Sequence, residues 1–388
     1  MSGSCPHRVL VVVGTRPEAV KLAPVVRAME EAAGFEPVVV STGQHREMLD
    51  QMLSALQVRV DVQLDVMRER QDLHGLTSRL SGQLGAVVAD GPYDAVVVQG
   101  DTTTALCGAL AAFYAGLPVA HVEAGLRSGV LTDPFPEELN RRLVSRLARW
   151  HFAPTLPAGT NLLREGVPVG DIEVTGNTVV DNLLWVVGRG LGTSAFAPEG
   201  ARRRTGPRIV VTLHRRENQG AVMAALARAV ADVADARDAE VVLPLHRSPA
   251  VRDVVLPVLG DHPRVRITEP LDYLDFTATL SRADLVLTDS GGVQEEAPSL
   301  DVPVLVLRRT TERPEAVRAG AAALVGTDPD DVRRAALDLI DDPGALRRMR
   351  SVDNPFGDGH ASARILERLD RDLTAAASQR PEAVAARP

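Results

Sequence analysis

The chain has 388 residues, enough for about two domains, and 45% of them are hydrophobic and 24% charged. These proportions indicate a globular protein and exclude a disordered or fibrous one. Forty-three basic and 51 acidic residues give a net charge of −8, which argues against nucleic-acid binding through bulk charge. No apolar run is long enough to span a membrane, and the N-terminus lacks a signal-peptide pattern. Two cysteines, Cys5 and Cys107, are too few for a disulfide framework or a cysteine zinc site, so we expect a cytoplasmic protein.

Short apolar runs bounded by turn residues alternate with amphipathic segments along the chain, a pattern typical of β-α-β units. Because the runs are apolar throughout rather than alternating, we expect parallel strands covered on both faces. The predicted strands are Arg8–Val13, Pro37–Ser41, Ala95–Gln99, Val119–Val122, Ile172–Val174, Ile209–Leu213, Val241–Pro244, Val265–Thr268, Leu285–Thr288 and Val304–Leu307. The predicted helices include Pro17–Glu31, Thr102–Ala115 and Ala221–Val233.

The segment Gly188–Pro207 has no periodicity and is rich in glycine, proline, alanine and arginine, so it separates two halves of similar size. The helix Asn177–Val187 leads into it. We predict an N-terminal domain at 1–178, a C-terminal domain at 179–360, a helix at 361–376 that packs back on the N-terminal domain, and a flexible tail at 377–388. The predicted fold class is α/β, with two Rossmann-like, doubly wound domains facing a central cleft, where the ends of the strands bind ligands.

Lys21 is the only lysine among the 43 basic residues. It lies one turn beyond Gly14-Thr15-Arg16-Pro17-Glu18, which ends the first strand. Helix capping explains Thr15, Pro17 and Glu18, but neither Arg16 nor Lys21. Cations beside a helix N-terminus favour phosphate binding, and a lysine left by chance is the alternative. No GxxxxGK[ST] or GxGxxG follows a strand, which disfavours a P-loop ATPase and a standard dinucleotide fold.

Three acidic positions lie at strand or helix edges of the first half: Asp101, Glu123 and Glu137. Asp101 could instead cap the helix that follows it. Glu137, beside Glu138, could instead complement a helix dipole, an effect of ~0.3–1 kcal/mol. We favour convergence of the three, because paired carboxylates suit proton transfer and cation stabilisation at a sugar carbon.

The second half carries basic and glycine-rich motifs at its strand ends. His214, Arg215 and Arg216 follow the first strand of this half and could hold an oxyanion or a diphosphate. His246 follows the next strand, where an idle, solvated histidine is an equal alternative. The run Ser290-Gly291-Gly292 opens a helix, so bare amides could face a nucleotide, with Glu296 one turn on for its sugar hydroxyls. The alternative for this run is a tight turn that needs glycine.

Ten motifs in order resemble the non-hydrolysing UDP-N-acetylglucosamine 2-epimerases, which have the two-Rossmann architecture of GT-B glycosyltransferases. The match extends from Arg8 to about Val325. It includes GTRPEAVKLAP, TGQHREMLDQ, QGDTTT, HVEAGLRSG, PFPEELNR, VTGNTVVDNL, TLHRREN, EPLDYLDF, LTDSGGVQEEAPS and TTERPEAVRAG.

The resemblance implies a role for each matching position. The implied catalytic residues are Lys21, Asp101, Glu123, Glu137 and His214. The implied UDP ligands are Arg16, His214, Phe276, Ser290, Gly291, Gly292, Glu296 and Arg313. A second UDP-sugar, which tunes bacterial members, would contact Gln44, Arg70, Arg215 and His246. At this second site Glu47 replaces a glutamine of some relatives, which argues against allosteric activation. Three other departures from the family pattern leave the sugar preference open: Asp133, Arg309 and Ala316.

The family's reaction implies anti elimination of UDP to a 2-acetamidoglucal, followed by re-addition with the opposite configuration at C2. It implies no metal or redox cofactor, a UDP-sugar substrate and a homodimer. Three alternatives remain: a hydrolysing epimerase that releases UDP and free N-acetylmannosamine, a GT-B glycosyltransferase, and a non-catalytic nucleotide-sugar binder. Mere binding does not need the three acids and Lys21, and the family-specific acids disfavour the transferase.

Overall fold

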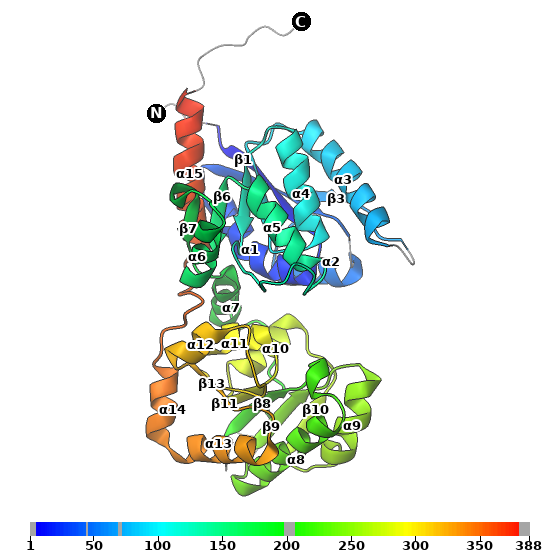
Figure 1. The fold of residues 1–388 in the computed structure, drawn as a ribbon, viewed down its shortest axis with the longest axis vertical. Coiled ribbons are helices and arrows are strands. Elements are labelled where there is room, and N and C mark those ends of the chain that lie inside the picture. Colours follow the sequence, from blue (N-terminus) through cyan, green and yellow to red (C-terminus); the bar gives the residue numbers. More distant parts are fainter. Residues whose placement is uncertain (1–4, 44–45, 69–71, 198–205, 380–388) are drawn as a thin grey trace, which may run out of the picture. The chain divides into compact units, whose positions relative to one another are not determined.

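The protein is described here by a computed structural model, which covers residues 5–43, 46–68, 72–197 and 206–379. The chain divides into two compact units (Figure 1). Unit 1 comprises Met1–Asn182 and Gly359–Pro388, and unit 2 comprises Leu183–Asp358. No helix among the described residues is long and apolar enough to cross a membrane.

Unit 1 contains, within its described residues, a seven-stranded parallel sheet of order β3-β2-β1-β4-β5-β6-β7. Its strands are β1 (His7–Val13), β2 (Phe35–Ser41), β3 (Val62–Gln63), β4 (Ala95–Gln99), β5 (Val119–Val122), β6 (Trp150–Ala153) and β7 (Ile172–Val174). Its helices are α1 (Arg16–Glu31), α2 (Arg46–Ala55), α3 (Leu73–Asp90), α4 (Thr103–Tyr114), α5 (Glu137–Leu147), α6 (Leu156–Arg164), the first part of α7 (Thr178–Gly188) and α15 (Ala361–Gln379).

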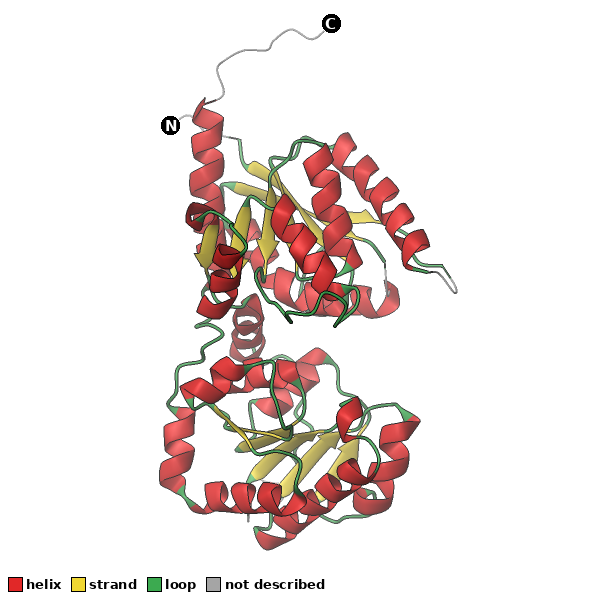
Figure 2. Cartoon of the chain, in the orientation of Figure 1, coloured by secondary structure: helices red, strands yellow, loops and turns green. Residues whose placement is uncertain are grey.

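The central strands of unit 1 are apolar because helices cover both faces of its sheet (Figure 2). Helices α3, α4 and α5 pack side by side, whereas α1 packs against α2 and α15. Helix α15 is also held by a hydrogen bond of 2.8 Å from the Trp150 indole to the Asp372 carboxylate. Trp150 and Phe152 are among the largest fully buried side chains.

Unit 2 contains, in the part of it that is described, a six-stranded parallel sheet of order β10-β9-β8-β11-β12-β13. Its strands are β8 (Arg208–Thr212), β9 (Glu240–Pro244), β10 (Val265–Thr268), β11 (Leu285–Thr288), β12 (Val304–Val306) and β13 (Ala322–Leu324). Its helices are α8 (Ala221–Ala236), α9 (Pro249–Leu259), α10 (Tyr273–Leu280), α11 (Gly291–Glu296), α12 (Pro314–Ala319), α13 (Pro329–Asp341) and α14 (Pro343–Arg350).

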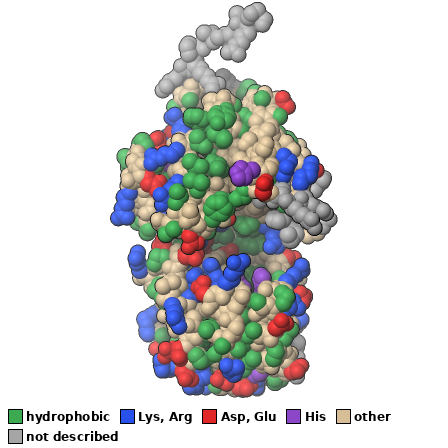
Figure 3. Space-filling view, turned by 45° about the vertical axis from the view of Figure 1, so that its right-hand side comes forward, with side chains coloured by type: hydrophobic (Ala, Val, Ile, Leu, Met, Phe, Trp, Pro, Cys, Tyr) green, Lys and Arg blue, Asp and Glu red, His purple; other side chains and the backbone are tan. Residues whose placement is uncertain are grey.

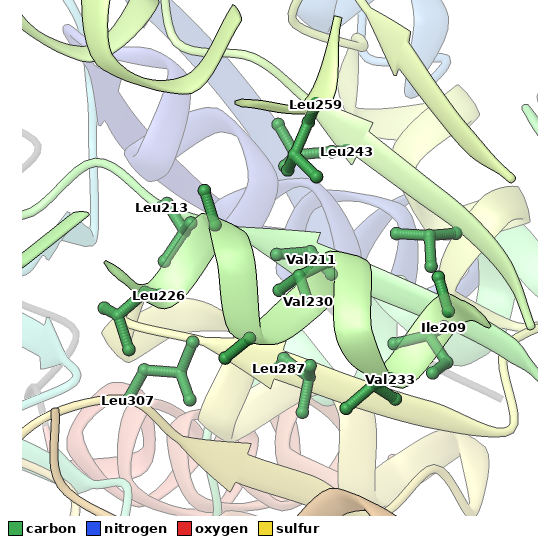
Figure 4. Close-up of a cluster of buried hydrophobic side chains, with 14 of the residues drawn as sticks. Ile209, Val211, Leu213, Leu226, Val230, Val233, Leu243, Leu259, Leu287 and Leu307 are labelled. Carbon is green, nitrogen blue, oxygen red and sulfur yellow. The ribbon is translucent and has the colours of Figure 1, made fainter. Parts of the chain in front are cut away.

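The core of unit 2 forms where α8 lays its apolar face on the strands (Figure 4). Val230 and Val233 of α8 belong to one buried cluster with Val211 and Leu287 of the sheet. On the face that Figure 3 shows, acidic and basic side chains are interspersed over both units, as the modest net charge predicts.

The α/β fold class and every predicted strand are confirmed, with ends that differ by at most two residues. Three short strands were missed: β3, β6 and β13. Val62–Gln63 and Ala322–Leu324 are too short to show periodicity. Trp150–Ala153 was missed because His151, a polar residue, interrupts its apolar run, although this histidine is buried in the sheet.

The strand order reverses at two places, between β1 and β4 in unit 1 and between β8 and β11 in unit 2. In doubly wound sheets, ligands bind beyond the carboxyl ends of the strands at such switch points. The motif that begins at Gly14 follows β1, and Asp101 follows β4; in unit 2, His214 follows β8 and Ser290 follows β11. The fold therefore places the sequence motifs at the two switch points.

Candidate functional site

The loop after β1 is fixed by a capping box. The Thr15 hydroxyl accepts the backbone N–H of Glu18, and the Glu18 carboxylate accepts the backbone N–H groups of Gly14 at 2.6 Å and Thr15 at 2.7 Å. This confirms the predicted cap at Thr15, whereas Glu18, predicted only to complement the helix dipole, also completes the capping box. Arg16 begins α1 and is exposed, whereas Lys21 is half-buried. Both cations lie in the first turns of α1, where an anion is favoured.

Glu18 is buried to 1% exposure, and burial raises its pKa to about 7 despite hydrogen bonds from Thr102, Gly14 and Thr15 that lower it. An acid whose pKa is raised in the folded state destabilises that state once it ionises. The unfolding free energy should therefore fall as the pH rises from about 4.5 to about 7, by about 3 kcal/mol from this group.

We expect Glu18→Gln to remove that dependence, because a neutral amide does not titrate. In urea denaturation at pH 4.5 and pH 8, the stability of the variant relative to the wild type should rise with pH by about 3 kcal/mol. Comparing the difference between the two proteins cancels the titration of all other groups. A difference that stays constant over this range would contradict the assignment.

Asp101 does not cap α4, so that alternative is wrong. The cap is Thr102, whose hydroxyl accepts the Ala105 N–H at 3.0 Å. The Asp101 carboxylate instead receives two N–H groups of Arg141, with Nε at 3.1 Å. Arg141 also donates to Glu138 at 3.1 Å, so burial of the arginine is compensated by two carboxylates.

A buried histidine, His121, holds the loop that carries Asp101 through a hydrogen bond to the Gly100 carbonyl. His121 Nε2 lies 2.8 Å from the Gly100 carbonyl oxygen, so this nitrogen carries the proton. Burial lowers the pKa of His121 to about 3, and the ring therefore stays neutral near pH 7. Gly100 itself has φ +71°, a left-handed conformation that glycine adopts without strain.

The Glu123 carboxylate is buried and surrounded by donors. Lys21 Nζ lies 2.5 Å from its Oε1, Asn177 donates to the same oxygen at 3.1 Å, and Gln99 donates to Oε2. The side-chain exposures of Lys21 and Glu123 are 18% and 6%, so this is a buried ion pair. A charge at this depth requires its partner, because an unpaired buried charge is strongly destabilising.

The backbone of Glu123 adopts φ +63°, in the left-handed region that side chains other than glycine rarely occupy. The surrounding structure holds this conformation: the next residue, Ala124, donates its N–H to the Phe152 carbonyl at 3.0 Å. Strained residues cluster at functional sites. The backbone and the ion pair thus point independently to a functional role for Glu123.

Glu137 is the first residue of α5 and is half-buried. Its position fits the dipole alternative as well as a catalytic one. Among the residues that the structure describes, its carboxylate makes no hydrogen bond or ion pair. Of the three acids, it alone has no cation bound to it in this part of the chain.

In unit 2, His214 is oriented by the buried Asp289. The Asp289 carboxylate accepts the backbone N–H of His214 and of Arg215 at 3.0 Å, and the amide of Asn218 at 3.1 Å. His214 Nδ1 lies 3.3 Å from Asp289 Oδ1, which places a proton on Nδ1 and leaves Nε2 directed away. Burial lowers the pKa of His214, against the opposing effect of Asp289.

The turn from β11 into α11 presents Ser290, Gly291 and Gly292. No side chain caps this helix start, and Gly292 is exposed. The Ser290 carbonyl accepts the Gln294 amide at 2.9 Å, and the Gln294 oxygen accepts the Thr311 hydroxyl at 2.6 Å. These contacts hold the turn in place, and no side chain caps the backbone amides of the two glycines.

The other predicted UDP ligands lie on neighbouring elements of unit 2. Phe276, on α10, is half-buried, as is Glu296 at the end of α11. Arg313, the residue before α12, donates to the buried Glu295. Glu295 was not predicted, and it holds this arginine in place.

Two of the four predicted second-site residues can be placed. Arg215 Nε donates to the Asp289 carbonyl at 3.2 Å, and the ring of the exposed His246 stacks on His214 with centroids 6.1 Å apart. Gln44 and Arg70 lie outside the described residues. The structure thus places Arg215 and His246 beside His214.

Sequence reasoning missed the partners that hold the site residues: Gln99, Asn177, Arg141, Asp289 and Glu295. All five lie inside the motifs already singled out by sequence. Arg141 lies four residues after Glu137 and so shares its helix face, but this spacing gives no signal of the contact with Asp101.

Residues 27–370 match the protein-family model of the UDP-N-acetylglucosamine 2-epimerases. The UDP-N-acetylglucosamine 2-epimerase of Salmonella typhimurium is 46% identical over 368 residues, which cover 93% of this chain and 98% of that one. The chain belongs to the UDP-N-acetylglucosamine 2-epimerase family. The crystal structure of the family member from Neisseria meningitidis, bound to UDP-GlcNAc, is 40% identical and has a TM-score of 0.82, covering 94% of this chain and 100% of that one.

The fold extends beyond this epimerase family. The glycosyltransferase of kitacinnamycin is only 15% identical, yet its structure matches 95% of this chain and 99% of its own with a TM-score of 0.64. The likeness shows the shared fold alone, and it agrees with the predicted GT-B-like architecture of two Rossmann-like units. In the described parts of the chain, no group of three or more His, Cys, Asp or Glu side chains is arranged to hold a metal ion.

Proposed function

We propose that the protein interconverts UDP-N-acetylglucosamine and UDP-N-acetylmannosamine without hydrolysis. The observation that carries the proposal is the Lys21–Glu123 ion pair, at the sheet edge of unit 1 that also bears Asp101. A protein that only bound the nucleotide would not need these groups. The relative from Neisseria meningitidis, whose structure contains UDP-GlcNAc, supports the substrate class.

The chemistry requires the bond from C1 to UDP to break as the C2 proton leaves. The C2 proton of a hexosamine is barely acidic, since no carbonyl lies next to it. Cationic character at C1 acidifies it, so a carboxylate can remove it. Elimination of UDP then gives a 2-acetamidoglucal, and re-addition of UDP with protonation on the opposite face gives the other epimer. Carboxylates near C1 and C2 stabilise the cation and transfer the proton.

The three acids of unit 1 divide these tasks by their surroundings. Glu123 and Asp101 are each held in an ion pair, with Lys21 and Arg141, which suits fixed carboxylates that stabilise positive charge at C1. Glu137 makes no ion pair among the described residues, so no bound cation has to be displaced before its carboxylate accepts the C2 proton. We assign proton transfer at C2 to Glu137.

The residues of unit 2 act on the nucleotide. The Ser290 hydroxyl, the amides of Gly291 and Gly292 and the His214 ring are the proposed diphosphate ligands of this unit, because the Ser290 amide already donates to the Thr288 hydroxyl at 2.9 Å. Arg16 of α1 is a further proposed diphosphate ligand. The His214 Nε2 faces away from Asp289, and a bound diphosphate raises the pKa of the ring, so that Nε2–H donates to the leaving oxygen. Phe276, Glu296 and Arg313 complete the proposed nucleotide contacts.

One experiment tests the proposal: incubation with UDP-GlcNAc in D2O, followed by proton NMR. We expect UDP-ManNAc to appear with deuterium at C2, and the C2 proton of the remaining UDP-GlcNAc to exchange. Free ManNAc with UDP would indicate the hydrolysing alternative, and UDP release that depends on an acceptor would indicate a glycosyltransferase. An unchanged spectrum would contradict any catalytic role.

Three predictions from the sequence stay predictions: the cytoplasmic location, the homodimer, and the second UDP-sugar site at Gln44, Arg70, Arg215 and His246. The domain roles, with catalysis in the first domain and UDP binding in the second, follow from the proposal above.

A further inference from the structure

A single buried carboxylate connects two loops of unit 1. Glu18 Oε2 accepts the backbone N–H of Gly14 and of Thr15 in the loop after β1, at 2.6 and 2.7 Å. Its other oxygen, Oε1, accepts the hydroxyl of Thr102 in the loop after β4, at 2.5 Å. Glu18 is only 1% exposed, so water does not compete for these bonds.

Each of the connected residues lies next to a residue of the proposed site. Thr15 precedes Arg16, a proposed diphosphate ligand, and Thr102 follows Asp101, a proposed catalytic carboxylate. The two loops lie 84 residues apart in the chain at the points where Glu18 and Thr102 meet. Glu18 therefore links the proposed phosphate contact to the proposed catalytic acid, although it belongs to neither.

The loop after β1 also packs closely against a side chain in the first turn of α4. A Cβ atom added to Gly14 would lie 2.4 Å from Thr104 Oγ1, in the first turn of α4, and 2.8 Å from Thr42 Oγ1. The backbone at Gly14 thus lies directly against α4, where no side chain fits. A shift of one loop must therefore displace the other, because a close-packed interior transmits displacement.

We propose that Glu18 is a positioning residue that holds the Arg16 loop in register with Asp101. This inference rests on the proposed function. Glu18 itself contacts no substrate in the proposal; it acts through Thr15 and Thr102. The register matters because the diphosphate and the C1–C2 bond belong to one rigid substrate, and a misplacement of about 1 Å at a reacting group lowers rates by about 100-fold.

The test removes the Thr102 end of the link and then restores it. Thr102→Val deletes the hydroxyl at constant shape, and we expect kcat for epimerisation to fall by about 10- to 100-fold, with KM and the Kd for UDP near wild type. Thr102→Ser keeps the hydroxyl and should keep most of kcat. This split distinguishes misalignment in the transition state from a loss of ground-state binding.

Loss of a helix cap is the competing explanation, since Thr102 also caps α4. Thr155→Val is the matched control: it removes the N-cap hydroxyl of α6, which accepts the Ala158 N–H at 3.3 Å and has no bond to Glu18. We expect Thr155→Val to lower stability comparably to Thr102→Val, by about 1 kcal/mol, with kcat unchanged.

The Glu18 end gives a second, independent measurement. Glu18→Gln keeps an acceptor for Gly14 and Thr15 and an N–H donor for the Thr102 oxygen, so it should retain most of kcat. Glu18→Ala should lose as much as Thr102→Val, and the double variant no more than either, because both remove one link.

Wild-type kcat in Thr102→Val, an equal kcat loss in Thr155→Val, or additive losses in the double variant would overturn the inference. These comparisons require that the wild-type protein exchanges the C2 proton of UDP-GlcNAc. If the wild type shows no exchange, the proposed function is wrong; if it exchanges but the variants behave as just described, only the inference about Glu18 is wrong.

Discussion

Glu123→Gln should lower both stability and activity, by about 3 kcal/mol in the free energy of unfolding and about 1,000-fold in C2 exchange. The stability loss arises because Lys21, 18% exposed in its side chain, loses the carboxylate that compensates its buried charge. The activity loss arises because the proposed C1 cation loses its stabilising carboxylate. Urea denaturation and the D2O assay measure the two effects separately.

The matched control is the double variant Lys21→Met/Glu123→Gln, which removes both charges. Its stability should recover to within about 1 kcal/mol of the wild type, because replacing a whole buried pair is often neutral. Its activity should stay as low as that of the single variant. A double variant as unstable as Glu123→Gln would show that the ion pair is not the source of the stability loss, and active Glu123→Gln would remove the residue from the mechanism.

Because Lys21 is the only lysine, NMR of a labelled lysine can monitor the Lys21–Glu123 ion pair directly. Reductive methylation with ¹³C-formaldehyde labels only Lys21 and the N-terminal amine, since the sequence has no other lysine. The dimethyl-Lys21 signal should therefore differ in chemical shift between the wild type and Glu123→Gln, because the substitution removes the carboxylate that lies 2.5 Å from Lys21 Nζ. Retention of C2 exchange after methylation would show that the methylated ammonium still serves the reaction.

The sequence predicted the positions of the site residues better than their partners. Gly14, Asp101, Glu123 and Ser290 follow buried apolar runs, and parallel strands place such positions at one edge of a sheet. The positions were therefore predictable from local patterns alone. What the patterns lacked was any signal of long-range contact between polar side chains.

The partners of the acids show why. Arg141 is 40 residues from Asp101, and Asn177 is 54 residues from Glu123. These contacts depend on how distant helices and strands pack together, which the local hydrophobic periodicity of the sequence does not reveal. The alternative that Asp101 caps α4 was wrong for the same reason. A capping residue can be recognised from its neighbours in sequence, but the competing attraction of Arg141 cannot, and Thr102 next to Asp101 was an equally good cap.

The left-handed backbone of Glu123 was also unpredictable from its sequence. Val-Glu-Ala favours no turn, and a glutamate has no intrinsic preference for positive φ. The conformation is imposed by the neighbouring strand, through the bond from Ala124 to Phe152, and by the donors that fix the carboxylate. Local and global preferences disagree here, as they tend to do at functional sites.

Glu137→Gln should abolish C2 exchange, with a loss of about 1,000-fold or more in kcat and little change in UDP affinity. The amide cannot accept the C2 proton, and elimination requires that acceptance, so neither UDP-ManNAc nor the glucal should form. Stability should change by less than about 1 kcal/mol, since among described residues no ion pair of Glu137 is lost.

The dipole explanation for Glu137 is tested by Asp330→Asn, which removes an exposed acid from the first turn of α13. Both substitutions should cost a similar, small amount of helix stability, but only Glu137→Gln should stop the exchange. Isothermal titration with UDP shows whether each variant retains its nucleotide site. If Glu137→Gln still incorporates deuterium at C2, Glu137 is not the proton-transfer group, and one of the two cation-bound acids must release its partner to act in its place.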